Sequence, residues 1–252
     1  MSTDRRIVLF DLFGVIARHQ RPGALAEMAA RCNAPADAFA EAYWACRRPY
    51  DAGQWSASEY WAAVLRWLSH TADADADTVE ELRLAAIDSW SRVDGRMVAY
   101  VRSLRDVAEV ALLSNLPSDH ADAFRAAQPW LRDLDHVAFS GKINAAKPDP
   151  AAFCHCVVAM RAAPADFLFV DDRDENVLQN SGPVGRVGNS VRPTRSGQDD
   201  PVGAELGQRL TGGEATVSRS DAVDVHIRRL HPGGGLHSHL QPQLLHGLPR
   251  QQ

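Results

Sequence analysis

The chain has 252 residues, of which 45% are hydrophobic, and a formal net charge of −5. This length is enough to bury the core of one domain together with a smaller insert. The negative charge argues against nucleic-acid binding, and the apolar stretches are too short for a signal peptide or a membrane span. The four cysteines form no CxxC pair, which favours buried, reduced thiols over a metal site, so we expect a cytoplasmic protein.

A short apolar run near the N-terminus predicts a buried strand that ends in a carboxylate. Residues Ile7 to Phe10 are all apolar, and Asp11 follows them directly. The carboxyl ends of strands are where an open α/β sheet places its chemistry, so Asp11 is a candidate catalytic residue. Taken alone, an ordinary strand followed by an aspartate is an equally good interpretation.

From about residue 18 to 92 the sequence pattern becomes helical. Apolar residues recur at spacings of three and four, which predicts four or so helices. Five of the six tryptophans fall in this segment, and we expect most of them in its core and one or two facing a cleft: Trp44, Trp55, Trp61, Trp67 and Trp90.

From about Asp94 onward, predicted strands and helices alternate along the chain. Strands are expected within 107–113, 137–140 and 166–170, and helices over 97–104, 119–127 and 151–160. Alternation at this spacing predicts an α/β fold with a doubly wound parallel sheet.

The C-terminal third has a different composition. No Phe, Trp or Tyr occurs after Phe169, and twelve of the seventeen glycines lie between Gly182 and Gly247. Such a segment cannot build a core of its own, so we expect residues 178–252 to be largely disordered and to contribute no side chain to an active site. A frameshifted C-terminus and a genuine extension are both open interpretations.

Four polar motifs follow the expected strands and loops in order along the chain. They are Asp11, Ser114-Asn115, Lys147-Pro148 and Asp171-Asp172, and Lys147 is one of only two lysines beside 25 arginines. This ordered set resembles the haloacid dehalogenase-like hydrolase superfamily, and within it the phosphatase-type branch with a helical cap. The resemblance covers roughly residues 5–177.

The resemblance implies both an architecture and a reaction. Residues 1–17 and 93–177 would form a Rossmann-like α/β core, and residues 18–92 a small helical cap. The implied reaction is Mg²⁺-dependent hydrolysis of a small phosphorylated metabolite through an aspartyl-phosphate. Asp11 would be the nucleophile, and Lys147 would supply positive charge during the transfer.

The other implied site residues surround these two. A ligand set made only of oxygens, next to a phosphate, fits Mg²⁺ rather than zinc, and two adjacent carboxylates at a buried strand end repel each other without a cation. The metal ligands would be Asp11, the backbone carbonyl of Phe13, Asp172 and Asp171; Ser114 and Asn115 would bind the phosphate, and Asn176 would orient the carboxylates or Lys147.

Phe13 departs from the phosphatase pattern. The family carries an aspartate two residues after the nucleophile, as general acid and base, an effect worth roughly 10²–10⁴ in rate. Dehalogenases of the superfamily also lack that aspartate, so a 2-haloacid dehalogenase that uses Asp11 on carbon is the alternative, with Arg47 or Arg48 as its cap arginine. The Asp171-Asp172 pair argues against it. A catalytically impaired member that only binds a ligand or a partner is a third hypothesis.

The sequence also departs from the family after Asn176. A further helix and strand normally follow the paired aspartates, whereas the fold-like pattern here stops near residue 177. We therefore expect the sheet to lack an edge.

Overall fold

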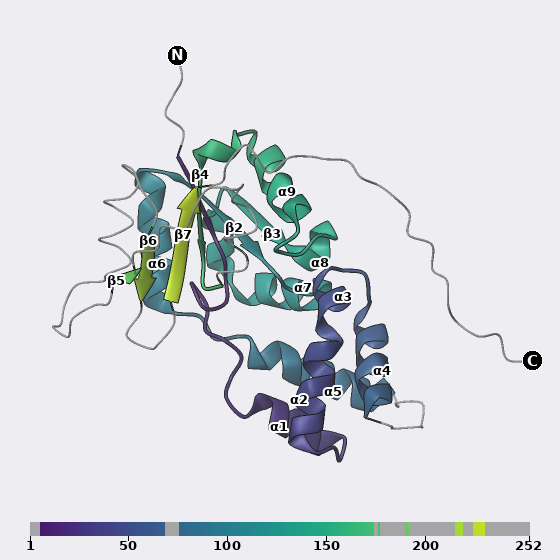
Figure 1. Ribbon diagram of the computed structural model, residues 1–252. Helices are drawn as coiled ribbons and strands as arrows, with labels where there is room; N and C mark the ends of the chain where they lie inside the picture. The colour runs from purple at the N-terminus through teal and green to yellow at the C-terminus, as the bar shows by residue number, and fades with distance from the viewer. Residues whose placement is uncertain are drawn as a thin grey trace, which may run out of the picture.

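The computed structural model describes residues 6–68, 76–173 and 176, and the backbone of three short strands at 190–191, 215–218 and 224–229. A sheet with the strand order β3-β2-β1-β4-β7-β6-β5 forms its centre (Figure 1). Its first four strands are mutually parallel: β1 (Ile7–Phe10), β2 (Glu109–Ser114), β3 (His136–Phe139) and β4 (Phe167–Asp171). The predicted α/β fold class is confirmed.

Both faces of the sheet are covered, which explains the continuous apolar run of β1. Val8 and Phe10 belong to a hydrophobic cluster on one face, and Ile7 and Leu9 to a separate cluster on the other. A strand buried on both sides has no solvent-facing positions and so needs no polar alternation. The first cluster contains residues of α6 (Gly95–Ser103) and α7 (Ser118–Ala127), and the second contains residues of α9 (Pro150–Met160).

Short elements join these strands and helices. They are η1 (Leu104–Asp106), η2 (Pro129–Asp133), α8 (Ser140–Ile143) and η3 (Pro164–Asp166). No helix in the described ranges has both the length and the apolar character that a membrane crossing requires. All four cysteines are free; Cys154 is exposed and the others are buried, so the expectation of burial is wrong for Cys154 alone.

A helical insert, residues 24–89, lies between β1 and α6 and packs below the sheet in the view of Figure 1. It has its own core, in which Tyr43, Tyr60 and Trp61 are fully buried. Ser56 and Glu59 form a capping box that begins its fourth helix. Its helices are α1 (Ala24–Arg31), α2 (Ala36–Ala45), α3 (Arg47–Asp51), α4 (Ala57–Trp67) and α5 (Ala76–Ser89). Whether the boundaries of a cap domain fall at 18 and 92 stays a prediction.

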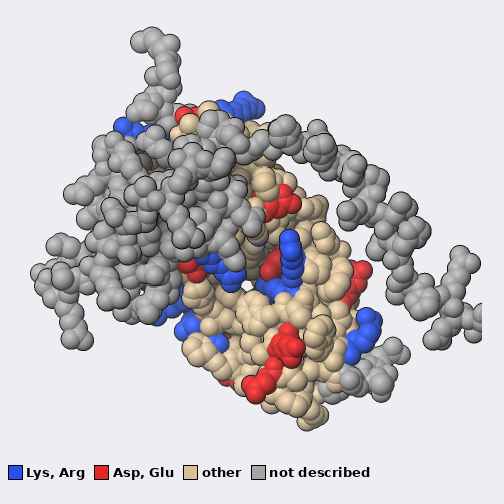
Figure 2. Space-filling model, viewed as in Figure 1, with Lys and Arg blue, Asp and Glu red and all other residues tan. Residues whose placement is uncertain are grey.

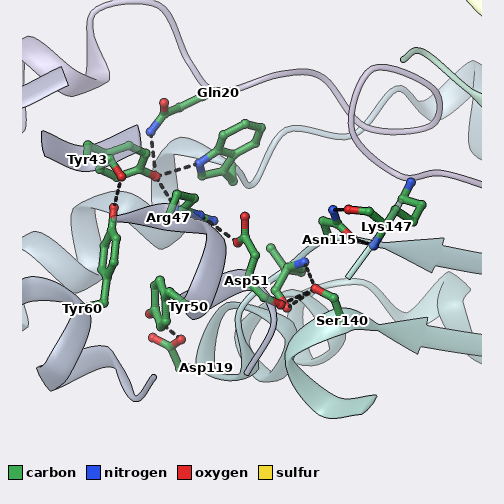
Figure 3. A network of polar contacts seen from close by, with 12 residues as sticks. Gln20, Tyr43, Arg47, Tyr50, Asp51, Tyr60, Asn115, Asp119, Ser140 and Lys147 are labelled. Carbon is green, nitrogen blue, oxygen red and sulfur yellow. Dashed lines mark hydrogen bonds and ion pairs between the residues drawn. The ribbon is translucent and has the colours of Figure 1, made fainter. Parts of the chain in front are cut away.

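Several contacts join the insert to the rest of the molecule. The two connecting segments are themselves joined by an antiparallel bridge between Ala17 and Val93. The Ser140 hydroxyl donates to the backbone carbonyl of Asp51 at the end of α3 (Figure 3).

A further contact is made by Asp119 of α7. Its carboxylate accepts from the Tyr50 hydroxyl at 2.6 Å and from Arg83 at 3.4 Å, and both donors belong to the insert. Beside the Ser140 contact, Gly53 and Gly141 approach closely: a Cβ on Gly53 would lie 2.6 Å from the carbonyl oxygen of Gly141. The insert is therefore packed against the core and not merely tethered to it.

The strands of the C-terminal segment correct one expectation. β7 (Asp224–Arg229) pairs antiparallel with β4, so the sheet continues past the strand at which it was expected to end. Val225 and Ile227 alternate with polar residues in this segment, but the run is too short to stand out in a glycine-rich sequence. The sheet then continues with β6 (Ala215–Ser218) and β5 (Ser190–Val191).

The expectation of disorder concerns the remainder of residues 178–252. Apart from the three strands, these residues lie outside the described part of the chain. Whether they are disordered or frameshifted therefore stays a prediction.

The packing of α9 on β4 gives a test of the core. Phe153 is 3% exposed and meets Phe169 edge to face at 5.1 Å between ring centroids. We expect Phe153→Ala to lower the free energy of unfolding by about 3–5 kcal/mol, because it removes buried area and leaves a cavity. Val158 on the same helix is 74% exposed, so Val158→Ala should change it by less than about 0.5 kcal/mol. Urea denaturation of both variants checks this; equal losses would contradict the described packing.

Candidate active site

Strand ends bring the predicted carboxylates together. Asp11 follows β1, and its backbone N–H donates to the carbonyl of Val170 on neighbouring β4 at 2.8 Å. Asp171 is the last residue of β4, and Asp172 follows it. One oxygen from each of the three carboxylates lies within 4.8 Å of the others. The parallel pairing of β1 with β4 thus gathers residues 160 positions apart in the sequence at one edge of the sheet.

Lys147 lies between two of these carboxylates. Its ammonium Nζ is 2.8 Å from Asp11 Oδ1 and 2.6 Å from Asp171 Oδ2, and the side chain is 1% exposed. Burial lowers the pKa of Lys147, but the attraction of Asp11 and Asp171 outweighs burial and raises the pKa above its ordinary value. The ammonium is therefore charged and fixed in place.

Asn115 holds the loop that carries this lysine. Its side-chain amide donates to the backbone carbonyl of Lys147 and its side-chain oxygen accepts from the backbone N–H of Lys147, each at 2.8 Å (Figure 3). Because both polar atoms of the side chain are engaged, Asn115 is built to position Lys147. The phosphate contact expected at Asn115, through backbone N–H groups near it, stays a prediction.

Asp171 is held from two further directions. The Asn176 side-chain amide donates to both oxygens of Asp171 at 3.0 Å, and the backbone N–H of Arg173 donates to Oδ1 at 2.8 Å. With Lys147 on Oδ2, this carboxylate is saturated with donors. The geometry agrees with the orienting role expected for Asn176 and makes Asp171 a fixed anchor for Lys147.

Asp172 is less fully paired. Its Oδ2 accepts from His19 Nε2 at 3.3 Å, and this hydrogen bond is the main cause of the raised pKa of His19. Its Oδ1 is buried and has no hydrogen-bond partner among the described residues. Gly14 leaves room for this carboxylate: it has a φ of +86°, and a Cβ there would collide with Asp172 and lie 2.8 Å from His19 Cε1.

The charges at this edge of the sheet do not balance. Burial raises the pKa of Asp11 to about 6, Lys147 acts in the opposite direction, and Asp171 and Asp172 add to the increase. Among the described residues, the three carboxylates contact one ammonium and one half-exposed histidine, and a buried oxygen of Asp172 has no hydrogen-bond partner. A divalent cation with a preference for oxygen ligands fits this donor set.

The remaining predicted residues lie at the same edge. Ser114 is the last residue of β2 and, although 1% exposed, lines the cleft above the carboxylates. The Phe13 ring does not point into solvent: it packs edge to face on Trp90 at 4.8 Å and on Phe124 at 5.9 Å. The roles of Ser114 and of the Phe13 carbonyl stay predictions.

A cleft of about 490 Å³ opens over these residues, between the core and the insert. Figure 2 shows Lys, Arg, Asp and Glu side chains gathered around a hollow on this face. The insert contributes Trp44, Arg47, Arg48 and Asp51 to its lining, and Trp90 lies beside them. Of the five tryptophans expected mostly in a helical core, only Trp61 is fully buried, whereas Trp44 and Trp90 face the cleft.

Several cleft residues make contacts that the sequence did not predict. Arg47, a candidate cap arginine of a dehalogenase from the sequence, is 5% exposed, pairs with Asp51 at 2.8 Å and donates to the Tyr43 hydroxyl at 2.6 Å (Figure 3). Its spacing of four residues from Asp51 on a helix was the available signal. His19 and Arg173 carry no such signal, because only the fold brings them to the cleft.

A family model for haloacid dehalogenase-like hydrolases matches residues 6–178. The chain belongs to this family. The superfamily predicted from the four motifs is thus confirmed. Among curated proteins, none matches the chain.

Solved structures of the family share the fold. A family enzyme of Bacteroides thetaiotaomicron is 18% identical, with a TM-score of 0.57 over 68% of this chain and 86% of that one. A predicted family hydrolase from Porphyromonas gingivalis is 19% identical, with a TM-score of 0.53 over 69% and 85%. The defluorinating L-2-haloacid dehalogenase Rha0230 is 22% identical, with a TM-score of 0.50 over 69% and 76%. At these identities the likeness shows a common fold.

The packing around Gly14 gives a test of this site. We expect Gly14→Ala to cost at least about 1–2 kcal/mol in stability, because φ is positive, and to abolish hydrolase activity, because the new Cβ would displace the Asp172 carboxylate. Gly95→Ala is the matched control, since nothing lies within 4 Å of a Cβ there. Melting temperature and activity of both variants check this, and an active Gly14→Ala enzyme would show that Asp172 has freedom to move.

Proposed function

We propose that this hydrolase removes phosphate from a small phosphorylated metabolite with the help of Mg²⁺, through an aspartyl-phosphate on Asp11. The observation that carries the proposal is the charge imbalance. Three carboxylates lie within 4.8 Å of one another with Lys147 between two of them, and Asp172 keeps a buried, unpaired oxygen. A site with this excess of negative charge accepts an anionic phosphate only when a further cation offsets it.

Asp11 is the group that would form the covalent bond. One of its oxygens attacks phosphorus, the bond from phosphorus to the ester oxygen breaks, and the leaving group departs with the electron pair. Lys147 is 2.8 Å from Asp11 and stabilises the negative charge that accumulates on the transferring group. The Ser114 hydroxyl, at the end of β2, is placed to donate to a phosphate oxygen.

The second half of the reaction returns the enzyme to its starting state. Water attacks phosphorus of the aspartyl-phosphate, the bond from phosphorus to Asp11 breaks, and inorganic phosphate leaves. Asp11, Asp172 and the Phe13 carbonyl would hold the ion, with Asp171 at its side anchoring Lys147. When bound, Mg²⁺ supplies positive charge that offsets both the carboxylates and the phosphate.

Solved structures of similar fold support the choice of Mg²⁺ and phosphate. Two structures of the Bacteroides thetaiotaomicron enzyme are complexes with magnesium and inorganic phosphate. The hydrolase YfnB from Bacillus subtilis, 15% identical with a TM-score of 0.50, is described as bound to magnesium.

Dehalogenation at carbon is the second candidate. Phe13 favours it, because a halide leaving group needs no proton and the ring supplies an apolar wall beside Asp11. Arg48 lines the cleft and could hold a substrate carboxylate, whereas Arg47 is already paired with Asp51. The unpaired oxygen of Asp172 has no purpose in this reaction, which is why we prefer the phosphatase.

A substrate panel with and without metal distinguishes the two reactions. We expect phosphate esters to be hydrolysed with Mg²⁺ and not with EDTA, and 2-haloacids to be left unchanged. Asp11→Asn should lower turnover at least about 10³-fold while keeping the fold, since it removes only the nucleophile. Asp149→Asn, at the exposed cap of α9, is the control for an aspartate-to-asparagine change and should stay active. Metal-independent release of halide would replace the proposal with the dehalogenase.

Phe13→Asp tests the missing general acid. The new carboxyl should raise kcat about 10²-fold or more on alkyl phosphates and change it little on p-nitrophenyl phosphate, whose leaving group needs no proton. Because Phe13 packs on Trp90 and Phe124, we also expect a loss of about 3–5 kcal/mol in stability, and Phe13→Asn is the control for that loss. Equal acceleration of both substrates would contradict the explanation.

A further inference from the structure

A second, smaller pocket lies directly beside the cleft. It has a volume of about 60 Å³ and shares Phe13, Trp90 and Leu116 with the lining of the cleft. The rest of its wall is mostly apolar and comes mainly from α7 and the end of α5. These lining residues are Ile87, Ser91, His120, Ala123, Phe124, Ala127 and Gln128. The pocket therefore continues the active site on the side where Phe13 stands.

His120 is the unusual residue of this pocket. It is 2% exposed, and neither ring nitrogen has a hydrogen-bond partner among the described residues. Its ring meets Tyr50 edge to face at 6.0 Å between ring centroids. Burial lowers the pKa of His120 far below its ordinary value, and Arg47 and Arg83 act in the same direction. The ring is thus neutral, with one N–H donor and one acceptor nitrogen.

Two buried polar atoms without partners are costly in a folded protein. Replacement by an apolar residue would remove that cost, so packing alone does not account for a histidine here. A hydroxyl group can pair with either ring nitrogen, as donor to one or acceptor from the other. The walls around it require that the rest of the bound group be apolar.

From these observations we infer that the pocket binds the organic end of the substrate, a compact apolar group that carries one hydroxyl directed at His120. A water needs about 10–15 Å³, so a pocket of about 60 Å³ holds roughly four to six heavy atoms of such a group. Asp11 and Phe13 are two residues apart, which is at most about 7 Å of chain. Because Phe13 lines both the pocket and the cleft that contains Asp11, a small molecule that extends from the cleft into the pocket would meet both. This assignment rests on the proposed function for the identity of the whole substrate, but not for binding in the pocket.

Nitrogen-detected NMR of His120, with sec-butanol as the probe, tests the pocket without metal or turnover. In the wild-type protein we expect sec-butanol to shift the His120 ring nitrogen signals with saturation, and to leave those of His136 unchanged. His136 is the internal control, because its buried Nε2 is also unpaired but it lies on β3, away from the pocket. The absence of a saturable shift at His120 would overturn the inference.

Two variants distinguish a binding site from a histidine that is merely buried without hydrogen-bond partners. His120→Leu should raise the melting temperature, since it removes the unpaired nitrogens. It should also weaken sec-butanol binding about three- to tenfold, followed by the change in tryptophan fluorescence, to which Trp90 in the pocket wall contributes. Ala123→Leu fills the pocket from α7 and should abolish the shift at His120 in a protein that still folds. If both variants bound sec-butanol as tightly as the wild type, the pocket would be no binding site. Saturable binding in a protein without phosphatase activity would refute the proposed function and leave the pocket standing.

Discussion

The structure depends on the burial of like charges at the ends of two adjacent strands. Asp11, Asp171 and Asp172 lie together because β1 and β4 pair in parallel, and the fold tolerates them because Lys147 stands between two of them. The surrounding contacts keep that arrangement in place. Asn115 fixes the lysine through its backbone, Asn176 fixes Asp171, and His19 meets one oxygen of Asp172. Among these contacts of the described residues, the Oδ1 of Asp172 is left without a partner and is therefore available to a ligand.

The parallel sheet and the polar residues at its edge could be predicted from the sequence, because both depend on local sequence patterns. The apolar runs before Asp11, Ser114 and Asp171 are buried strands, and such runs need no knowledge of the rest of the chain. The role of Asn115 could not be predicted in the same way, since its partner lies 32 residues further along. His120 was missed for the same reason: on its helix it is one polar residue among several, and only the fold buries it.

Phe13 connects the chemistry to the specificity of this hydrolase. Where the resemblance to phosphatases implies a proton donor, this chain has a ring that packs against Trp90 and Phe124 and forms a wall shared by the cleft and the smaller pocket. Under the proposed function, this exchange removes a catalytic group and adds an apolar surface at the same point. Loss of rate on poor leaving groups and gain of selectivity for an apolar one would thus come from a single residue.

Contacts between the insert and the core bear on how a substrate enters. The Ser140 contact to Asp51 and the Asp119 contacts to Tyr50 and Arg83 join the two parts at a distance from the connecting segments, which are themselves bridged at Ala17 and Val93. A swing of the insert away from the core would have to break these hydrogen bonds. A ligand that contacts both walls of the cleft would add to the interactions that keep the insert and the core together.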